Sequence, residues 1–260
     1  MGRAIQFRLH RGARSAIEQL DLLLDDAYGA PEADLDNKDD PLDEAVYIVL
    51  SFQTNLERLK LVWEKLRSTF PDWEHVAKAP LCHVAEAIRI GGLQEQKART
   101  IRKLLETAKE ATGTYSLDVL RDMDNENAER FLTRLPSLSW KAARCVLLYS
   151  LGRDVFPVDG NTFRIFKRVG VLDGKSVYRR RGLHDGLQDA VGAARRKAFH
   201  INLVVHGQRT CLPRRPRCSI CTARSICPMC GVPADIMSHA RADSNSGSHA
   251  VQISRKRVHA

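Results

Sequence analysis

The 260-residue sequence lacks any hydrophobic run long enough to cross a membrane. A membrane-spanning helix needs about 18 or more consecutive apolar residues. The first residues, MGRAIQFRLHRGARSA, are basic but contain no continuous apolar stretch, so we expect no signal peptide. The sequence therefore predicts an intracellular protein without a membrane partner, in the cytoplasm and nucleoid of a prokaryote or in the nucleus or an organelle of a eukaryote.

The sequence also lacks the sustained alternation of apolar and polar residues that is typical of β-strands. Helical spacing is present instead. Residues 13–28 place four aliphatic side chains on one helical face, and residues 56–70 place aliphatic and aromatic side chains on another. We therefore expect a nearly all-helical (all-α) fold.

Outside one acidic segment, basic residues outnumber acidic residues by almost two to one. Residues 21–44 hold ten Asp and Glu residues against the single basic residue Lys38. The rest of the chain then has 40 basic and 21 acidic residues, a surplus of 19, within a formal net charge of +10. Such a surplus indicates a polyanionic partner, most simply nucleic acid, although an ordinary soluble protein can also be basic.

Cysteine is sparse except in one segment: five of the seven cysteines lie between residues 211 and 230. This clustering and the odd number favour a metal or cluster site in a reducing compartment over a disulfide framework. Cys82 and Cys145 lie in apolar helical contexts and are expected in the core. Cys230 is not part of the four-cysteine pattern. It is either not a ligand or a ligand that can replace one of the four.

Four of these cysteines follow the spacing C-x6-C-x2-C-x5-C: Cys211, Cys218, Cys221 and Cys227. Only the central pair has the spacing of a zinc knuckle. A single compact loop suits the four thiolate corners of an iron–sulfur cubane better, so the spacing favours iron–sulfur but leaves zinc open. The same loop carries three arginines, which are suited to bind phosphates and also offset the charge of thiolates: Arg214, Arg215 and Arg217.

The segment HGQRTC and the cysteine spacing that follows it closely resemble the C-terminal cluster loop of the endonuclease III family of helix-hairpin-helix DNA glycosylases. This resemblance covers about residues 43–228. It implies a [4Fe-4S] cluster bound by the four cysteines. It also implies that the cluster is a scaffold for a DNA-contacting loop.

The resemblance implies a two-lobed, all-α helix-hairpin-helix glycosylase fold. Residues 231–260 contain few large apolar groups and are expected to be disordered. The expected parts are an N-terminal helix and acidic loop (1–42) packed on the cluster lobe, a helical barrel lobe (43–155), a cluster lobe (156–230) and the tail (231–260).

The stretch LPSLSWKAARCVLLYSLGRDVFPVDGNTFRIF resembles the helix-hairpin-helix and the following Asp-bearing loop of this family. The resemblance places Lys141 at the catalytic lysine and Asp159 at the catalytic aspartate. Such an amine attacks the sugar C1′ and leaves a Schiff base that permits β-elimination. The carboxylate stabilises positive charge on the sugar. We expect the helix start and burial to lower the pKa of Lys141.

Four further residues are implied as DNA contacts. Ser137 and Ser139 stand where the family has glycines that allow positive φ and close approach to a phosphate. Serine is expected to cost about 1 kcal/mol of backbone strain at each position. A hydrogen bond from its hydroxyl to the same phosphate would offset part of this cost. The segments IVLSFQTN and IGGLQEQKA resemble those that open the duplex, with Gln53 filling the gap of a flipped base and Leu93 wedging into the opposite strand.

The resemblance implies a monomeric base-excision-repair glycosylase with AP lyase activity on damaged, oxidised pyrimidines and abasic sites in double-stranded DNA. Two alternatives share the fold: a mismatch or modified-cytosine glycosylase, and a damage-binding protein with little turnover, which the two serines favour. A zinc-ribbon DNA-binding module is a third. An adenine glycosylase is disfavoured because Lys141 is present.

Overall fold

The computed structural model describes residues 9–30 and 35–229, and these residues form helices and loops without any β-strand. The all-helical prediction is confirmed for this part of the chain. The predicted tail at 231–260 and Cys230 lie outside the described residues. The helices are α1 (Ala13–Tyr28), α2 (Pro41–Ser51), α3 (Leu56–Thr69), α4 (Trp73–Lys78), α5 (Leu81–Ala87), α6 (Gln94–Thr112), α7 (Asn125–Leu132), α8 (Trp140–Leu151), α9 (Gly160–Val169), α10 (Arg181–Ala190) and α11 (Arg196–Arg209), with the short 3-10 helices η2 (Arg89–Gly91), η3 (Asp118–Asp122), η4 (Ala193–Arg195), η5 (Cys218–Ile220) and η6 (Thr222–Ile226).

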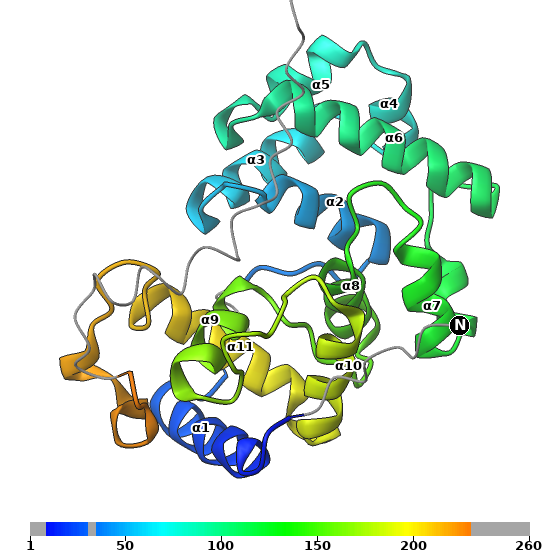
Figure 1. The fold of residues 1–260 in the computed structure, drawn as a ribbon. Helices are drawn as coiled ribbons and strands as arrows, with labels where there is room; N and C mark the ends of the chain where they lie inside the picture. The colour runs from blue at the N-terminus through cyan, green and yellow to red at the C-terminus, as the bar shows by residue number, and fades with distance from the viewer. Residues whose placement is uncertain (1–8, 31–34, 230–260) are drawn as a thin grey trace, which may run out of the picture.

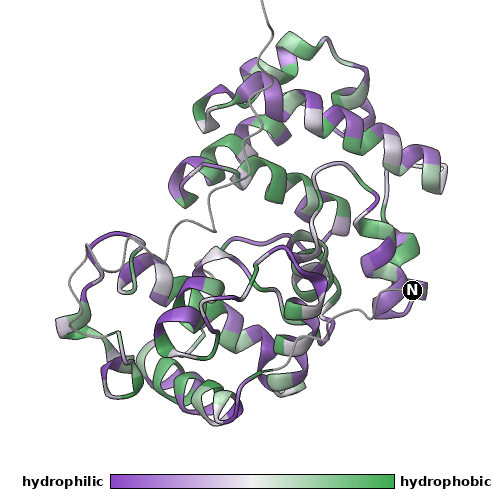
Figure 2. Ribbon diagram, viewed as in Figure 1, coloured by the Kyte–Doolittle hydropathy of each residue, from purple (hydrophilic) through white to green (hydrophobic). Residues whose placement is uncertain are grey.

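Helix α2 is the central helix of one half of the molecule. It begins after Asp40, whose carboxylate accepts hydrogen bonds from the backbone N–H groups of Leu42 and Asp43, and Pro41 occupies its first turn. Between Leu42 and Leu50 every residue except Asp43 is buried. The helix is correspondingly hydrophobic on nearly all sides (Figure 2), as expected for an element packed against α3, α6 and α8.

The buried hydrophobic residues form two clusters, and each belongs to one half of the molecule. The first core consists of buried residues between Leu42 and Val155. The second core combines α1, from Ala13 to Leu24, with residues between Phe156 and Ala223. In Figure 1, α2 to α6 lie in the upper half, whereas α1, α9 and α11 lie in the lower half. Helix α1 packs against α11 and η6, so an N-terminal helix completes a core made mostly from the C-terminal half.

A buried arginine links the two halves. Arg144 on α8 is 1% exposed and donates to both carboxylate oxygens of Glu129 on α7, at 2.9 and 3.4 Å. It also donates to the backbone carbonyl of His184, at 2.8 Å, and to the carboxylate of Asp185, both on α10. A guanidinium has five N–H donors, and Arg144 makes two hydrogen bonds to α7 and two to α10. The side chain therefore joins α8 to both of these helices.

The structure corrects one expectation about the core. Cys145 is buried as predicted, but Cys82 is exposed near the start of the short helix α5. The buried face of α5 is made instead by Val84, Ala85 and Ala87. Among the described residues, no helix combines the length and the apolar character that a membrane span requires.

Candidate active site and DNA-contacting loops

The structure brings Lys141 and Asp159 together although they belong to different halves of the molecule. Lys141 is the second residue of α8, which packs in the first core. Asp159 precedes α9, which packs in the second core. Both residues are partly exposed, and the charge of each affects the pKa of the other. The amine and the carboxylate therefore share one site at the junction of the two cores.

Local structure holds the carboxylate of Asp159 in one orientation. Its Oδ1 caps α9 by accepting from the backbone N–H of Thr162 at 2.7 Å, and its Oδ2 accepts from the side-chain amide of Asn161 at 2.9 Å. Burial opposes ionisation, but the nearby Lys141 ammonium and these hydrogen bonds act to keep the pKa of Asp159 below its ordinary value. Asp159 is therefore a fixed carboxylate at neutral pH.

The pKa of Lys141 differs from the sequence-based expectation. Burial acts to lower it, but interactions with Cys145, Asp159 and Tyr178 raise the pKa of Lys141 above its ordinary value. Burial also raises the pKa of Cys145 to about 11 and that of Tyr178 to about 12, so both are neutral near pH 7. Asp159 is then the anionic neighbour of Lys141. The expected lowering of this pKa is wrong for the DNA-free protein, and the ammonium must lose a proton before it can attack.

Three residues beside this pair were missed from the sequence: Cys145, Tyr178 and His200. Cys145 lies four residues after Lys141, and this spacing places both on one face of α8. That spacing is a signal that could have identified Cys145. Tyr178, in the loop before α10, and His200, on α11, approach the site only through the tertiary fold. Burial lowers the pKa of His200 to about 4, and its Nδ1 is 2.6 Å from the hydroxyl of Tyr149, so this imidazole is neutral.

Left-handed backbone conformations coincide with the predicted DNA contacts. The non-glycine residues with positive φ in the described part of the chain are Ala30, Asp36, Gln53, Leu93, Ser137 and Arg215. The last four have φ values of 55°, 52°, 63° and 50°, and each lies in a separate loop. Such residues are uncommon and cost about 1–3 kcal/mol each, and they cluster at sites where function requires them. The backbone thus singles out four of the predicted DNA-contacting residues independently of their side chains.

The two serines of the hairpin differ in conformation. Ser137 has the glycine-like φ of 63°, so the expected strain is present there. Ser139 has an ordinary extended conformation and caps α8, with its hydroxyl accepting from the backbone N–H of Ala142 at 3.4 Å. Serine is a preferred residue at such a position, so the expected strain at Ser139 is absent.

A buried lysine joins the loops that carry Gln53 and Leu93. Lys97, on α6, is 3% exposed, and its Nζ donates to the backbone carbonyls of Leu50 and Gly91, at 2.8 and 2.9 Å. It also donates to the hydroxyl of Thr54 at 2.6 Å. One ammonium with three acceptors therefore fixes the loop after α2 relative to the loop before α6.

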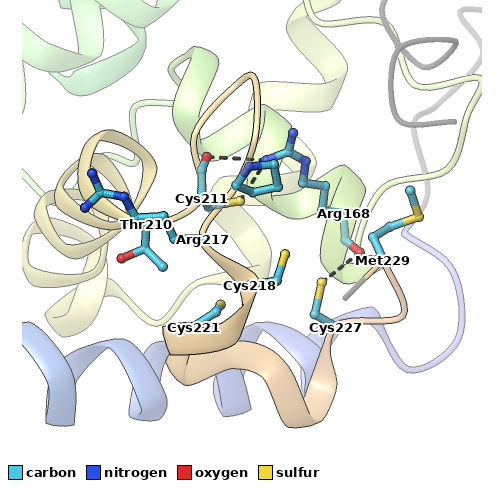
Figure 3. Close-up of a pocket in the computed structure, with 9 residues that line it drawn as sticks. Arg168, Thr210, Cys211, Arg217, Cys218, Cys221, Cys227 and Met229 are labelled. Atoms are coloured by element: carbon cyan, nitrogen blue, oxygen red, sulfur yellow. Dashed lines mark hydrogen bonds between the residues drawn. The ribbon is translucent and has the colours of Figure 1, made fainter. Parts of the chain in front are cut away.

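The four predicted cluster ligands line one pocket, and their sulfur atoms face a common space: Cys211, Cys218, Cys221 and Cys227 (Figure 3). Arginines of α9 hold one side of this loop. Arg164 donates to the backbone carbonyl of Cys211 at 3.0 Å, and Arg168 donates to its Sγ at 3.1 Å. Helix α9 therefore has Asp159 before its first residue and the cysteine loop against its last turns.

The three arginines of the cysteine loop are exposed: Arg214, Arg215 and Arg217. Arg217 also lines the cysteine pocket, which is visible in Figure 3. Gln53 and Leu93 are exposed as well, and the exposed fraction of Leu93 is 44%. All seven predicted DNA-contacting residues are therefore exposed. The hydroxyl of Ser139 is already used to cap α8, whereas the other six side chains have no such role.

Comparison with known proteins places the fold in a family. Residues 46–182 match the HhH-GPD superfamily base excision DNA repair protein. Endonuclease III of Sulfolobus acidocaldarius is 26% identical over 69% of this chain and 78% of its own length. A candidate DNA glycosylase of Arabidopsis thaliana is 33% identical over 50% of this chain, but the match spans only 44% of the plant protein.

A solved structure of a trapped endonuclease III–DNA covalent intermediate has the same fold. It superimposes with a TM-score of 0.71 at 21% identity and covers 83% of this chain and 95% of that chain. The family match covers more than half of the present chain and includes both Lys141 and Asp159. The chain therefore belongs to the HhH-GPD superfamily of base excision DNA repair proteins, with endonuclease III among its relatives.

Proposed function

We propose that the protein is a monomeric, bifunctional DNA glycosylase and AP lyase that acts on damaged, oxidised pyrimidines in duplex DNA. The observation that carries this proposal is the convergence of the Lys141 amine and the Asp159 carboxylate at the junction of the two cores. A glycosylase that uses only water needs no amine at this position. The fold shared with a covalent endonuclease III–DNA intermediate supports an amine nucleophile.

The two side chains have complementary roles in the proposed reaction. After losing a proton, Lys141 forms a bond to the sugar C1′, and the bond from C1′ to the base breaks with its electron pair leaving on the base. The nitrogen lone pair then breaks the C1′–O4′ bond, and O4′ takes up a proton as the sugar ring opens. The resulting protonated Schiff base acidifies C2′, and loss of the C2′ proton expels the 3′ phosphate. Asp159 is held ionised by its neighbours, so it stabilises the positive charge that develops on the sugar.

The exposed loops supply the proposed contact with DNA. A base must leave the stack before C1′ can be attacked, and this costs a few kcal/mol. Gln53 and Leu93 are placed to fill the gap and to separate the strands, because Lys97 holds their loops together. Phosphates would be bound by the hairpin serines and by the exposed arginines of the cysteine loop: Ser137, Ser139, Arg214, Arg215 and Arg217.

The cysteine pocket fits the proposed [4Fe-4S] cluster. Four thiols from one loop line the same pocket, with the cation of Arg168 at the Sγ of Cys211. The C-x6-C-x2-C-x5-C spacing of the four cysteines in the sequence supports a group with four corners over one zinc ion. When bound, the cluster would fix the shape of the arginine-bearing loop, and no step of the reaction requires it.

Borohydride trapping tests the proposal. The protein would be incubated with duplexes that carry thymine glycol, an abasic site or no lesion, beside the variants Lys141→Ala and Lys103→Ala. Lys103 is an exposed lysine on α6 and serves as the matched control. We expect a covalent complex on both lesions, its loss in Lys141→Ala and its retention in Lys103→Ala.

Other outcomes have distinct meanings. Trapping on the abasic site alone contradicts the assignment to oxidised pyrimidines, and release of base from mismatched or modified-cytosine duplexes would then identify the alternative substrate. Tight binding to lesions without any trapping or base release contradicts the enzyme proposal and favours a damage-binding protein. Metal analysis that finds zinc without sulfide contradicts the cluster assignment.

A further inference from the structure

We propose that Tyr178 contacts the flipped base and donates a hydrogen bond to a carbonyl oxygen of a pyrimidine, which assists departure of the base. This inference rests on the proposed glycosylase function. Tyr178 lies in the loop between α9 and α10, outside the hairpin and the Asp-bearing segment that carry the proposed chemistry. Its ring nevertheless contacts Phe163 on α9, the helix that the Asp159 carboxylate caps.

The ring of Tyr178 is held from two sides. It makes an edge-on contact with the ring of Phe163, on α9, with a centroid distance of 5.3 Å and an interplanar angle of 65°. The ring of His184, on α10, lies at 5.5 Å, and its Nε2 is 2.8 Å from the backbone carbonyl of Tyr178. Side chains from both flanking helices therefore orient the phenol before any substrate binds.

The hydroxyl of Tyr178 is available to a ligand. Tyr28, Tyr47 and Tyr149 form hydrogen bonds through their hydroxyls to His206, Asp36 and His200, respectively; these include bonds of 2.9, 2.9 and 2.6 Å. Within the described part of the chain, the structure gives the hydroxyl of Tyr178 no such bond, although the residue is partly buried. A half-buried hydroxyl without a protein partner is suited to bond a substrate atom.

The charges of the catalytic pair act on the ionisation of this hydroxyl. Burial and the charge of Asp159 raise the pKa of Tyr178 to about 12, whereas the nearby Lys141 acts in the opposite direction. The phenol therefore lies within electrostatic range of both members of the catalytic pair. It also remains protonated near neutral pH, so it can serve as a hydrogen-bond donor.

The chemistry of base release identifies the acceptor. When the bond from C1′ to the base breaks, its electron pair stays on the base, and negative charge spreads to the carbonyl oxygens. Every pyrimidine has a carbonyl oxygen, O2, next to the nitrogen that was bonded to the sugar. A donor held beside the reacting sugar would therefore meet the atom that gains charge, and such a bond would strengthen as the transition state is reached.

Single-turnover kinetics with two substrates test the inference. Tyr178→Phe keeps the ring and its contacts but removes the hydroxyl, and Tyr115→Phe, in the loop after α6, is the matched control. Release of thymine glycol from a duplex and borohydride trapping on a pre-formed abasic duplex would be measured for each protein. We expect Tyr178→Phe to slow release of thymine glycol about 100-fold, as for loss of one oxyanion donor, and to leave trapping on the abasic duplex unchanged.

The outcomes separate this inference from the proposed function. Equal rates for Tyr178→Phe and the wild type on both substrates would overturn the base contact. Equal slowing on both substrates would also overturn it, because an abasic site has no base and the hydroxyl would then act on Lys141 or on the fold. A wild-type protein that releases no pyrimidine would instead overturn the proposed function, and the inference with it.

Discussion

Ser137 has a left-handed backbone conformation that glycine adopts without strain and serine does not. We predict that Ser137→Gly raises the free energy of unfolding by about 1 kcal/mol, because the strain is removed at a position that needs positive φ. DNA affinity should be kept or increased, because the backbone conformation that we propose for phosphate contact is unchanged. Urea denaturation and fluorescence anisotropy with an abasic-analogue duplex would measure the two quantities.

Ser139 supplies the matched control, two residues away in the same hairpin. Its backbone is extended and its side chain caps α8, so Ser139→Gly removes a cap and relieves no strain. This variant should be no more stable than the wild type. If both glycine variants were equally stabilised, the strain assigned to Ser137 would be wrong.

At the residue scale, the sequence allowed only part of the site to be predicted. Lys141 and Asp159 were identified through their spacing in a family motif, and the structure brings the two together. The pKa of Lys141 was predicted in the wrong direction, because burial lowers it as expected but the interactions with Asp159 and the other neighbours of the amine raise it further. Tyr178 and His200 carry no local signal, since the loop that carries Tyr178 and the helix that carries His200 meet the site only in the folded chain.

At the scale of elements, α9 and α11 cross at a glycine. A Cβ built on Gly207 of α11 would lie 2.6 Å from the Cβ and Oδ1 of Asn161, which is far inside van der Waals contact. Asn161 is the residue that donates to Oδ2 of Asp159. We predict that Gly207→Ala costs about 1–3 kcal/mol of stability by overpacking and slows base release at least about tenfold, because a displaced Asn161 leaves Asp159 less well oriented.

Gly192 is the control for this variant, because no atom lies within 4 Å of a Cβ added there. Gly192→Ala should leave base release unchanged when both variants are assayed under single-turnover conditions. Wild-type rates in Gly207→Ala, despite the lost stability, would show that Asn161 does not position Asp159.

The elements with regular periodicity were the most predictable. The apolar stripe predicts a helix over residues 13–28, and α1 spans these residues with Ile17, Leu20 and Leu24 buried. The short helix α5 has seven residues, too few for a stripe to show which side is buried, and Cys82 was placed on the wrong side. The partner of α1 could not be predicted from periodicity, because a stripe specifies a buried face and not the element that covers it.

At the scale of the whole molecule, Arg144 is a buried link between the two halves. We predict that Arg144→Met lowers the free energy of unfolding by about 3–5 kcal/mol, because the carboxylate of Glu129 would remain buried without its partner. The double variant Arg144→Met/Glu129→Met should lose less, since no charge is then left unpaired at Glu129. Urea denaturation of the two variants would test this order, and a double variant less stable than the single one would contradict it.

The second core also has a consequence for biosynthesis. Helix α1 is made before the other described helices, but its main partner α11 begins only at Arg196, about 170 residues after Leu24. At about 5–20 residues per second, the apolar face of α1 remains uncovered for about 9–34 s during translation. The first core comes from one continuous stretch of chain that ends at Val155, so all of its residues are made before α11. During translation the half that carries Lys141 can therefore fold early, while α1 remains a hydrophobic segment available to chaperones.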